Sequence, residues 1–261
     1  MEGHPRFMSS TPSDLWIRRF RPSPEAADRL VCFPHAGGSA SFYVPVATAL
    51  SPDVDVVAIQ YPGRQDRRSE PGPASVAELA DGVTAALAGW DDRPLTFFGH
   101  SMGALVAFEV ARRMERAGSG PVRLFASGRR APSRTRDERV HTLDDDGVIA
   151  ELRALNGTDS QLLDDEEVLR MVLPAIRSDY RAVETYRCEP GARVRCPVTV
   201  LTGDADPRTS LEEARDWSGH TEADSDLRVF SGGHFFLSER PAEVLAVLRE
   251  HFAATPAAGR V

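Results

Sequence analysis

The 261-residue sequence lacks long apolar runs, is poor in cysteine and carries no excess of basic charge. No stretch approaches the roughly 20 apolar residues that cross a bilayer, so we expect no membrane span. The first residues show no apolar core, and we expect no signal peptide. With 39 acidic and 31 basic residues the net charge is −8. This balance does not favour nucleic acid as a partner.

The cysteines number only three: Cys32, Cys188 and Cys196. Their odd number and their spacing fit neither a disulfide framework nor a zinc module. Cys32 lies inside an apolar run, where a buried free thiol is the usual structural role. Unpaired thiols favour a reducing compartment, so we expect a cytoplasmic location.

What the sequence does contain is an alternation of short apolar runs with helical patterns. The runs are rich in β-branched or aromatic residues and mostly end at glycine or proline, which is typical of strands. We predict strands at Trp16–Phe20, Arg29–Phe33, Val54–Gln60, Leu95–Phe98, Val122–Ser127, Val198–Thr202 and Leu227–Phe230. Between two of them, Ser75–Trp90 has the spacing of an amphipathic helix. This alternation predicts an α/β fold, a mainly parallel sheet with helices on both faces.

The alternation is interrupted between about residues 135 and 187, where no strand pattern occurs. Helices are predicted here at Asp144–Leu155, Asp164–Leu173 and Pro174–Tyr186. Asp144 and Asp164 are suitable N-caps. An insertion between two parallel strands projects from the edge of the sheet where active sites gather. We interpret it as a helical lid, the alternative being an extra packing layer.

No other segment suggests a second folding unit. The sequence contains no internal repeat, no low-complexity tract and no further region with a core of its own. We therefore expect one domain over residues 1–261. Its ends, residues 1–13 and 255–261, are expected to be disordered tails.

The strongest motif is Gly-x-Ser-x-Gly at Gly99–Gly103. Such a nucleophile elbow holds its serine on a sharp, strained turn, and its glycines leave room for the neighbouring strand and helix. The bare motif is weak evidence because it occurs by chance. Here the strand Leu95–Phe98 precedes it and the helical run Ala104–Ala111 follows it. We therefore predict Ser101 to be the nucleophile, the alternative being an idle serine on a glycine-rich turn.

A serine hydroxyl needs a base to take its proton. In this fold the partners follow the nucleophile in the order acid, then histidine, which leaves His220, His234 and His251. His251 belongs to a helical pattern and His220 to a polar stretch. His234 follows a predicted strand through one serine and two glycines. We predict His234 as the base, the alternative being a histidine on a surface loop.

The acid of the triad is expected after the strand Val198–Thr202, where Asp204 and Asp206 compete. Because this acid usually lies a few residues past the end of the strand, Asp206 is preferred. Asp204 is then expected to stabilise the turn. The role of Asp206 would be to fix the imidazole tautomer and to stabilise the imidazolium.

Two backbone N–H groups are expected to form the oxyanion hole. One belongs to Met102, directly after the nucleophile. The other is predicted at Ala36, since the segment His35–Gly38 follows an early strand and reads His-x-Gly-Gly. His35 and His100 flank this region, and we interpret both as scaffold or substrate-facing residues.

These segments together resemble the type II thioesterases that accompany polyketide synthases and nonribosomal peptide synthetases, members of the α/β-hydrolase superfamily. The resemblance extends from Trp16 to about Phe252. The matching segments are Trp16–Phe20, Leu30–Ala40, Gln60–Arg64, Gly99–Ala104, Ser127–Pro132, Leu173–Tyr180 and Gly232–Leu237. The two motifs His-Ala-Gly-Gly and Gly-His-Ser-Met-Gly are together more specific than the elbow alone.

The resemblance implies the α/β-hydrolase fold and an activity in antibiotic biosynthesis: removal of aberrant or stalled acyl groups from the phosphopantetheine arm of carrier proteins. It implies Ser101 as nucleophile, Asp206 as acid and His234 as base, with Ala36 and Met102 as oxyanion donors. The expected partners are acyl or peptidyl carrier protein domains and small acyl thioesters. We expect no metal, bound cofactor, nucleic acid or membrane, and a monomer.

Two other functions remain open at this point. A carboxylesterase, a lipase or an acyltransferase can use the same triad, because the fold does not fix the reaction. A non-catalytic scaffold of the same fold is more remote, since such proteins typically lose a triad member.

Two arginine clusters add a hypothesis about the partner. One comprises Arg64, Arg67 and Arg68, and the other Arg129, Arg130, Arg134, Arg136 and Arg139. Carrier proteins are commonly acidic, so a basic patch near the entrance would steer their docking. The alternative is a pair of solvated loops.

Overall fold

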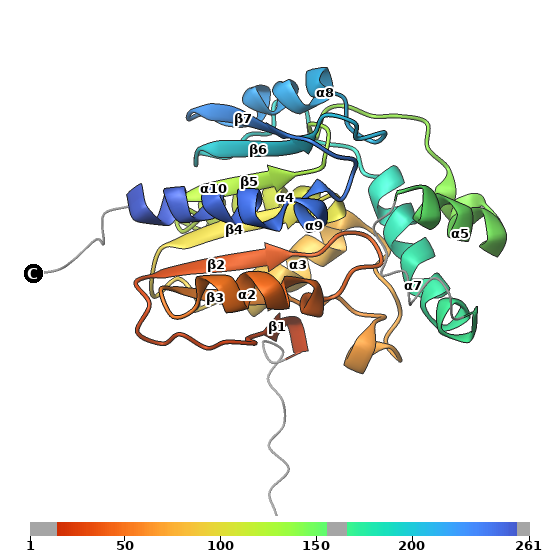
Figure 1. The fold of residues 1–261 in the computed structure, drawn as a ribbon, viewed down its shortest axis with the longest axis horizontal. Coiled ribbons are helices and arrows are strands. Elements are labelled where there is room, and N and C mark those ends of the chain that lie inside the picture. Colours follow the sequence, from red (N-terminus) through yellow and green to blue (C-terminus); the bar gives the residue numbers. More distant parts are fainter. Residues whose placement is uncertain (1–14, 156–165, 255–261) are drawn as a thin grey trace, which may run out of the picture.

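The central feature of the computed structural model, which describes residues 15–155 and 166–254, is a single seven-stranded sheet (Figure 1). Its strand order is β1-β3-β2-β4-β5-β6-β7. The strands are β1 Ile17–Arg18, β2 Asp28–Phe33, β3 Val54–Ile59, β4 Leu95–His100, β5 Arg123–Ser127, β6 Val198–Gly203 and β7 Ser225–Phe230. β1 pairs antiparallel with β3, and every other pair is parallel. The predicted α/β class is confirmed, and each predicted strand is present, β1 in shorter form.

Helices cover both faces of this sheet. They are α2 Val44–Leu50, α3 Val76–Ala86, α4 Met102–Arg116, α5 Asp145–Ala154, α7 Glu166–Glu184, α8 Leu211–Arg215, α9 Phe236–Glu239 and α10 Pro241–Ala254. One apolar cluster joins the sheet to α3 and α4, and a second joins its other face to α2, α9 and α10. Burial on both faces is what makes the strands nearly continuous apolar runs.

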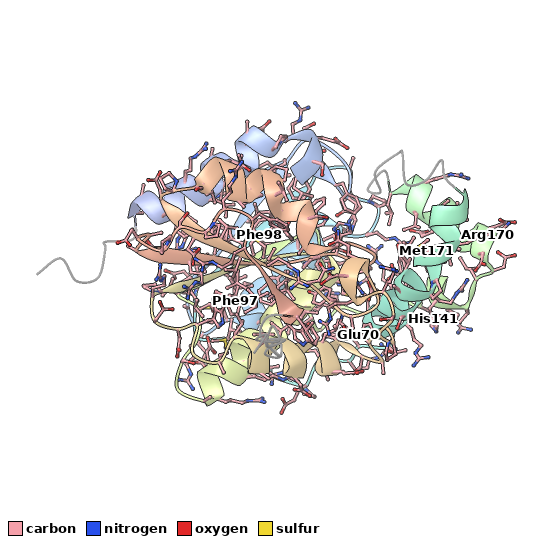
Figure 2. The ribbon with its side chains drawn as sticks, turned by 90° about the horizontal axis from the view of Figure 1, so that it is seen from below. Glu70, Phe97, Phe98, His141, Arg170 and Met171 are labelled. Atoms are coloured by element: carbon pink, nitrogen blue, oxygen red, sulfur yellow. The ribbon has the colours of Figure 1, made fainter. Side chains whose placement is uncertain are left out.

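The alternation of side chains along β4 illustrates this two-sided core. Phe97 and Phe98 are consecutive, so they point to opposite faces of the sheet. Phe97 belongs to the cluster under α3 and α4, and Phe98 to the cluster under α2 and α10 (Figure 2). Both rings are at most 2% exposed. The strand is therefore held by close packing on both faces of the sheet.

Between β5 and β6 the described residues form helices and no strand of the sheet. We call this segment the insertion; its main helices, α5 and α7, lie beyond the carboxyl ends of the parallel strands (Figure 1). A small apolar cluster of its own holds it together, formed by Val140, Val148, Leu152, Leu169, Leu173 and Ile176. Asp144 caps α5 as predicted, because its carboxylate accepts a hydrogen bond of 2.9 Å from the Gly147 N–H.

One predicted boundary is wrong. Two helices were expected to meet at Pro174, whereas α7 runs without a break from Glu166 to Glu184 with Pro174 inside it. A proline removes one N–H from the helix and normally kinks or ends it. Here Leu173 and Ile176 flank it and pack into the insertion's cluster, which compensates for the missing hydrogen bond. The predicted N-cap Asp164 and the expected tails lie outside the described residues.

No helix among the described residues is both long and apolar enough to cross a bilayer.

Candidate active site

Ser101 occupies the turn between β4 and α4 in a strained backbone conformation, with φ 54° and ψ −116°. A β-carbon added at Gly99 would lie 2.3 Å from the Gly103 carbonyl oxygen. One added at Gly103 would lie 2.0 Å from the Phe33 carbonyl oxygen. Both contacts are far shorter than any real one, so only glycine lets α4 approach β2 and β4 this closely. The turn is the nucleophile-elbow geometry.

His234 and Asp206 meet Ser101 from the neighbouring strand ends. The Ser101 Oγ lies 3.1 Å from His234 Nε2. The other ring nitrogen, Nδ1, lies 2.9 and 3.0 Å from the two carboxylate oxygens of Asp206. Because a carboxylate only accepts, Nδ1 carries the proton and Nε2 presents its lone pair to the serine hydroxyl. His234 is 4% exposed and the Asp206 side chain 0%, so water does not compete for this contact.

Asp204, the competing acid, lies on the turn instead. Its carboxylate accepts a hydrogen bond of 3.0 Å from the Gly232 N–H. The Ala205 N–H donates to the Gly232 carbonyl at 3.0 Å, and the Asp204 N–H donates to the Phe230 carbonyl at 2.8 Å. These bonds join the loop after β6 to the loop after β7. Asp204 therefore fixes the distance between the loops that carry Asp206 and His234.

The loop after β2 places Ala36 beside Ser101, and both line one small cavity. The His35 carbonyl accepts a hydrogen bond of 2.9 Å from the Gly38 N–H. Met102 is the first residue of α4. An N–H in the first turn of a helix has no acceptor within the helix and lies at the positive end of its dipole. Both predicted oxyanion donors thus belong to the backbone around the serine.

The cavity measures about 50 Å³, and Ser101 and His234 line it. The insertion supplies its apolar wall: Leu152 and Leu155 come from the α5 end, and Tyr180 and Val183 from α7. Four charged side chains also line it, namely Arg129, Glu138, Glu184 and Arg208, together with the rings of His35 and Phe235. A serine with a base, two backbone donors and an enclosed apolar wall can perform acyl transfer.

Comparison with known proteins assigns the family. The thioesterase domain family matches residues 28–252. This chain belongs to the thioesterase family. It is therefore a thioester hydrolase, and the resemblance to type II thioesterases inferred from the motifs is confirmed.

Individual relatives agree with this membership. The Streptomyces griseus protein named "Probable cadicidin biosynthesis thioesterase" is 58% identical over 224 residues, which are 86% of this chain. The aligned part is 62% of that relative's length, so this chain spans less than two thirds of it. Thioesterase PikA5 of Streptomyces venezuelae is 52% identical over 93% of this chain and 87% of its own length. The structure of the type II thioesterase BorB, from the borrelidin biosynthetic cluster, matches with a TM-score of 0.87 and 52% identity, covering 93% of this chain and 100% of BorB.

Two further histidines of the thioesterase surround His234 in neutral form. Burial lowers the pKa of His35 to about 3, with the nearby charges of His234 and Arg64 as smaller causes. Burial likewise lowers the pKa of His100 well below its ordinary value. The His100 ring is held by the Ser127 hydroxyl at 3.0 Å from Nδ1. Neutral rings add no positive charge beside His234. His35 lines the cavity, whereas His100 packs beneath it against His234 and Phe235.

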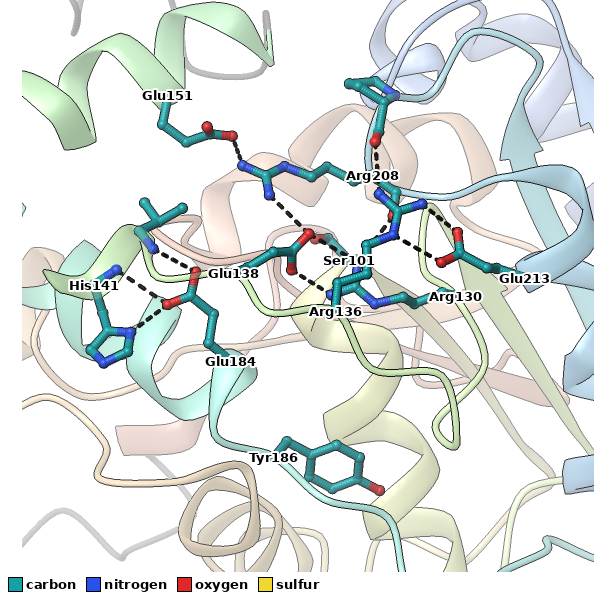
Figure 3. A network of polar contacts seen from close by, with 12 residues as sticks. Ser101, Arg130, Arg136, Glu138, His141, Glu151, Glu184, Tyr186, Arg208 and Glu213 are labelled. Carbon is teal, nitrogen blue, oxygen red and sulfur yellow. Dashed lines mark hydrogen bonds and ion pairs between the residues drawn. The ribbon is translucent and has the colours of Figure 1, made fainter. Parts of the chain in front are cut away.

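A network of ion pairs ties the acid loop to the insertion (Figure 3). Glu138 pairs with Arg130 and with Arg208, the latter at 2.9 Å. Arg208 also pairs with Glu151 of α5, and its N–H donates to Asp206 Oδ1 at 2.8 Å. No motif in the sequence singles out Arg208 or Glu138. The position of Arg208, two residues after the acid, was the available signal.

The arginines of the two clusters differ in how far they reach the surface. Arg64 and Arg67 are 6% and 4% exposed. Arg67 pairs with Glu70 and packs 4.4 Å from the Trp16 ring, so only Arg68 of that cluster is exposed.

In the second cluster, Arg130 pairs with Glu138, Arg134 with Asp216, Arg136 with Glu213 and Arg139 with Asp137. The Arg130 side chain is 3% exposed, whereas those of Arg134 and Arg139 are 47% and 72% exposed. The hypothesis that the arginine clusters dock a carrier protein stays a prediction, and Arg68, Arg134 and Arg139 are the members that reach the surface.

Proposed function

We propose that this thioesterase removes aberrant or stalled acyl groups from the phosphopantetheine arm of acyl or peptidyl carrier proteins. The observation that carries the proposal is the unbroken hydrogen-bonded line from Ser101 through His234 to Asp206 at the mouth of the cavity. The names of the relatives, which place them in natural-product biosynthesis, support the carrier-bound substrate.

In the first half of the reaction, Ser101 attacks the carbonyl carbon of the thioester while His234 Nε2 takes its proton. The oxyanion that forms is stabilised by the N–H groups of Ala36 and Met102. Asp206 holds the ring and stabilises the imidazolium. The carbon–sulfur bond then breaks, and the phosphopantetheine thiolate takes the proton from His234. The products are the free carrier thiol and an acyl ester on Ser101.

In the second half, a water molecule replaces the thiol beside His234. His234 takes a proton from this water as it attacks the ester carbonyl, and the same two N–H groups stabilise the oxyanion. The Ser101 oxygen leaves and regains its proton, which releases a carboxylic acid. We propose that neither metal nor bound cofactor takes part, because these groups supply every proton transfer and charge stabilisation that the reaction needs.

The walls of the cavity suit an apolar acyl group. Leu152 and Val183 line it together with Ser101, so they can contact the carbon chain of an acyl group on the serine. A cytoplasmic site of action fits the three cysteines, which are all free thiols in the structure.

The test is unloading of a propionyl-phosphopantetheinyl carrier protein, followed by intact-protein mass spectrometry. Wild-type protein should restore the free thiol, and Ser101→Ala should leave the carrier loaded. A matched oxygen ester and thioester of propionate report the preferred bond. If the protein cleaves the oxygen ester rapidly but leaves the carrier loaded, the proposed function is wrong and an esterase activity replaces it.

A further inference from the structure

Asp179 on α7 is a buried charge for which the reaction steps have no use. Its side chain is 0% exposed, and both oxygens have partners. Oδ2 accepts a hydrogen bond of 2.8 Å from the Gly37 N–H, and Oδ1 accepts one of 2.8 Å from Arg64 Nη2. Gly37 directly follows Ala36, and it lies 142 positions before Asp179 in the chain. A helix of the insertion thus holds the loop that carries an expected oxyanion donor.

Arg64 extends this contact to the far side of the loop. Its Nη1 donates to the Gly38 carbonyl at 3.1 Å. Gln60, at the end of β3, accepts a hydrogen bond of 2.9 Å from the Ala40 N–H and donates to the Arg64 carbonyl at 3.3 Å. The polar groups of the loop are therefore bound from α7 and from the β3 end at once. Such charge-assisted bonds have a defined direction as well as strength.

Packing on the same face of α7 reinforces the hydrogen bond. Ile176 lies one turn before Asp179, and a β-carbon added at Gly37 would be 2.9 Å from Ile176 Cγ1. Gly37 has φ +75°, a conformation that favours glycine. Tyr180, directly after Asp179, and Val183, one turn further along, line the cavity beside Ser101. One helix face therefore contacts the oxyanion loop and forms the cavity wall.

Asp179 acts on Ala36 through the neighbouring peptide group. Peptide groups are planar, so the carbonyl and the N–H of one group turn together. The Ala36 N–H belongs to the same peptide group as the His35 carbonyl, which accepts the Gly38 N–H. The next peptide group carries the Gly37 N–H, which donates to Asp179. With the groups on both sides of Ala36 held, rotation about its backbone bonds, which would redirect the Ala36 N–H, is restricted.

We propose that Asp179 is a positioning residue that orients the Ala36 N–H as an oxyanion donor through Gly37. The proposal rests on the role of Ala36 in the proposed function. Burial raises the pKa of Asp179, while Arg64 opposes this shift. A buried ion pair is weak evidence for a stabilising role, because desolvation offsets its attraction. The specific bond to Gly37 indicates a role in orientation. An acyl group that displaces α7 would also break the bond between Asp179 and Gly37 and misorient the Ala36 N–H. Such a substrate would therefore be hydrolysed with a lower kcat.

The experiment compares Asp179→Ala and Asp179→Asn with the control Ser178→Ala. Ser178, on the same helix, donates to the Pro73 carbonyl at 2.7 Å and does not touch the oxyanion loop. The substrate is a small acetyl thioester, with active sites counted by a fluorophosphonate that labels Ser101. A second readout is the affinity of an alkyl boronic acid, whose tetrahedral adduct places an oxygen in the hole.

We expect Asp179→Ala to lower kcat per titrated site by about 10²-fold, the typical effect of losing one oxyanion donor, with KM changed less than about threefold. Boronate affinity should fall in parallel. Asp179→Asn keeps the shape and one acceptor for Gly37, so it should restore part of kcat. Ser178→Ala should match wild type. All four proteins are compared at a temperature below their measured melting transitions.

The proposal is overturned if Asp179→Ala keeps full kcat and boronate affinity per titrated site and loses only thermal stability. Should the alanine variant not fold, Asp179→Leu, which keeps the side-chain volume and has no acceptor for the Gly37 N–H, is judged by the same criterion. The proposed function is tested separately, by unloading of the carrier protein. If the carrier stays loaded, the proposed function fails, but the comparison of Asp179 variants on the small thioester can still be made. Ser101→Ala supplies the background rate in both assays.

Discussion

The two loops that build the site are held in different ways. The loop that carries His234 is bound to the adjacent loop after β6, through Asp204 and Asp206, over a separation of 28 positions. The loop that carries Ala36 is bound to α7 of the insertion, over 142 positions. The first depends on neighbouring strands of the sheet. The second depends on a helix that also lines the cavity beside Ser101.

This difference separates two functions within one site. Proton transfer needs the serine, base and acid in fixed geometry for every substrate, and the rigid sheet provides that. In the proposed mechanism, stabilisation of the oxyanion is tied to the helix that lines the cavity beside Ser101. Substrate discrimination would then act on the oxyanion donor and leave the base in place.

The largest expected effect tests the loop held by the sheet. Asp206→Asn should lower kcat by about 10⁴-fold, because the imidazole loses the carboxylate that fixes its tautomer. Asp204→Asn is the matched control, since its amide oxygen still accepts from the Gly232 N–H, and it should cost less than about tenfold. Steady-state hydrolysis of a small acyl thioester measures both. A larger loss in the Asp204 variant than in the Asp206 variant would mean that Asp204 is the acid of the triad.

A pair of glycine substitutions compares the loops directly. Gly37→Ala introduces a β-carbon 2.9 Å from Ile176 at a positive φ, so it should displace the oxyanion loop. Misplacement on this scale costs roughly 10- to 10²-fold in kcat. Gly233→Ala, beside His234, meets open space and should retain nearly full activity. Equal losses in the two variants would mean that the loops do not differ in the way described.

The smallest expected effect is a change of the melting temperature with pH. It reports on the stability of the fold and not on the position of either loop. Burial lowers the pKa of His35 to about 3 and that of His251 to about 4. As the pH falls below about 6.5, the unfolded chain takes up these protons before the folded protein does. Stability is therefore lost between about pH 6.5 and pH 4, and the melting temperature should fall by a few degrees from pH 7 to pH 5.

His251→Gln provides the control for that pH effect. His251 lies in α10, where its Nε2 is 2.9 Å from the Thr96 hydroxyl, away from the site. The variant should make the melting temperature less sensitive to acid and leave kcat at pH 7 unchanged. An unaltered pH dependence, followed by differential scanning calorimetry, would show that His251 does not contribute.

The sheet and the residues around Ser101 could be predicted because their signals are local. In both cases a glycine-containing turn follows a predicted strand, and Ser101 or His234 lies a few residues after the end of that strand. Asp179 could not be assigned a role in this way. Its contact with Gly37 arises because α7 packs on a loop that is distant in the sequence, and no local sequence pattern predicts this contact. The break expected at Pro174 failed for a related reason, since packing outweighed local propensity.

The most direct test of the account is a single turnover of propionyl-carrier protein with the enzyme in excess, quenched in acid and digested for peptide mass spectrometry. The account predicts a propionyl group on the peptide that contains Ser101 before free acid accumulates. It also predicts no such peptide and a fully loaded carrier with Ser101→Ala. Hydrolysis by Ser101→Ala at the wild-type rate, or a propionyl group on another residue, would contradict the account.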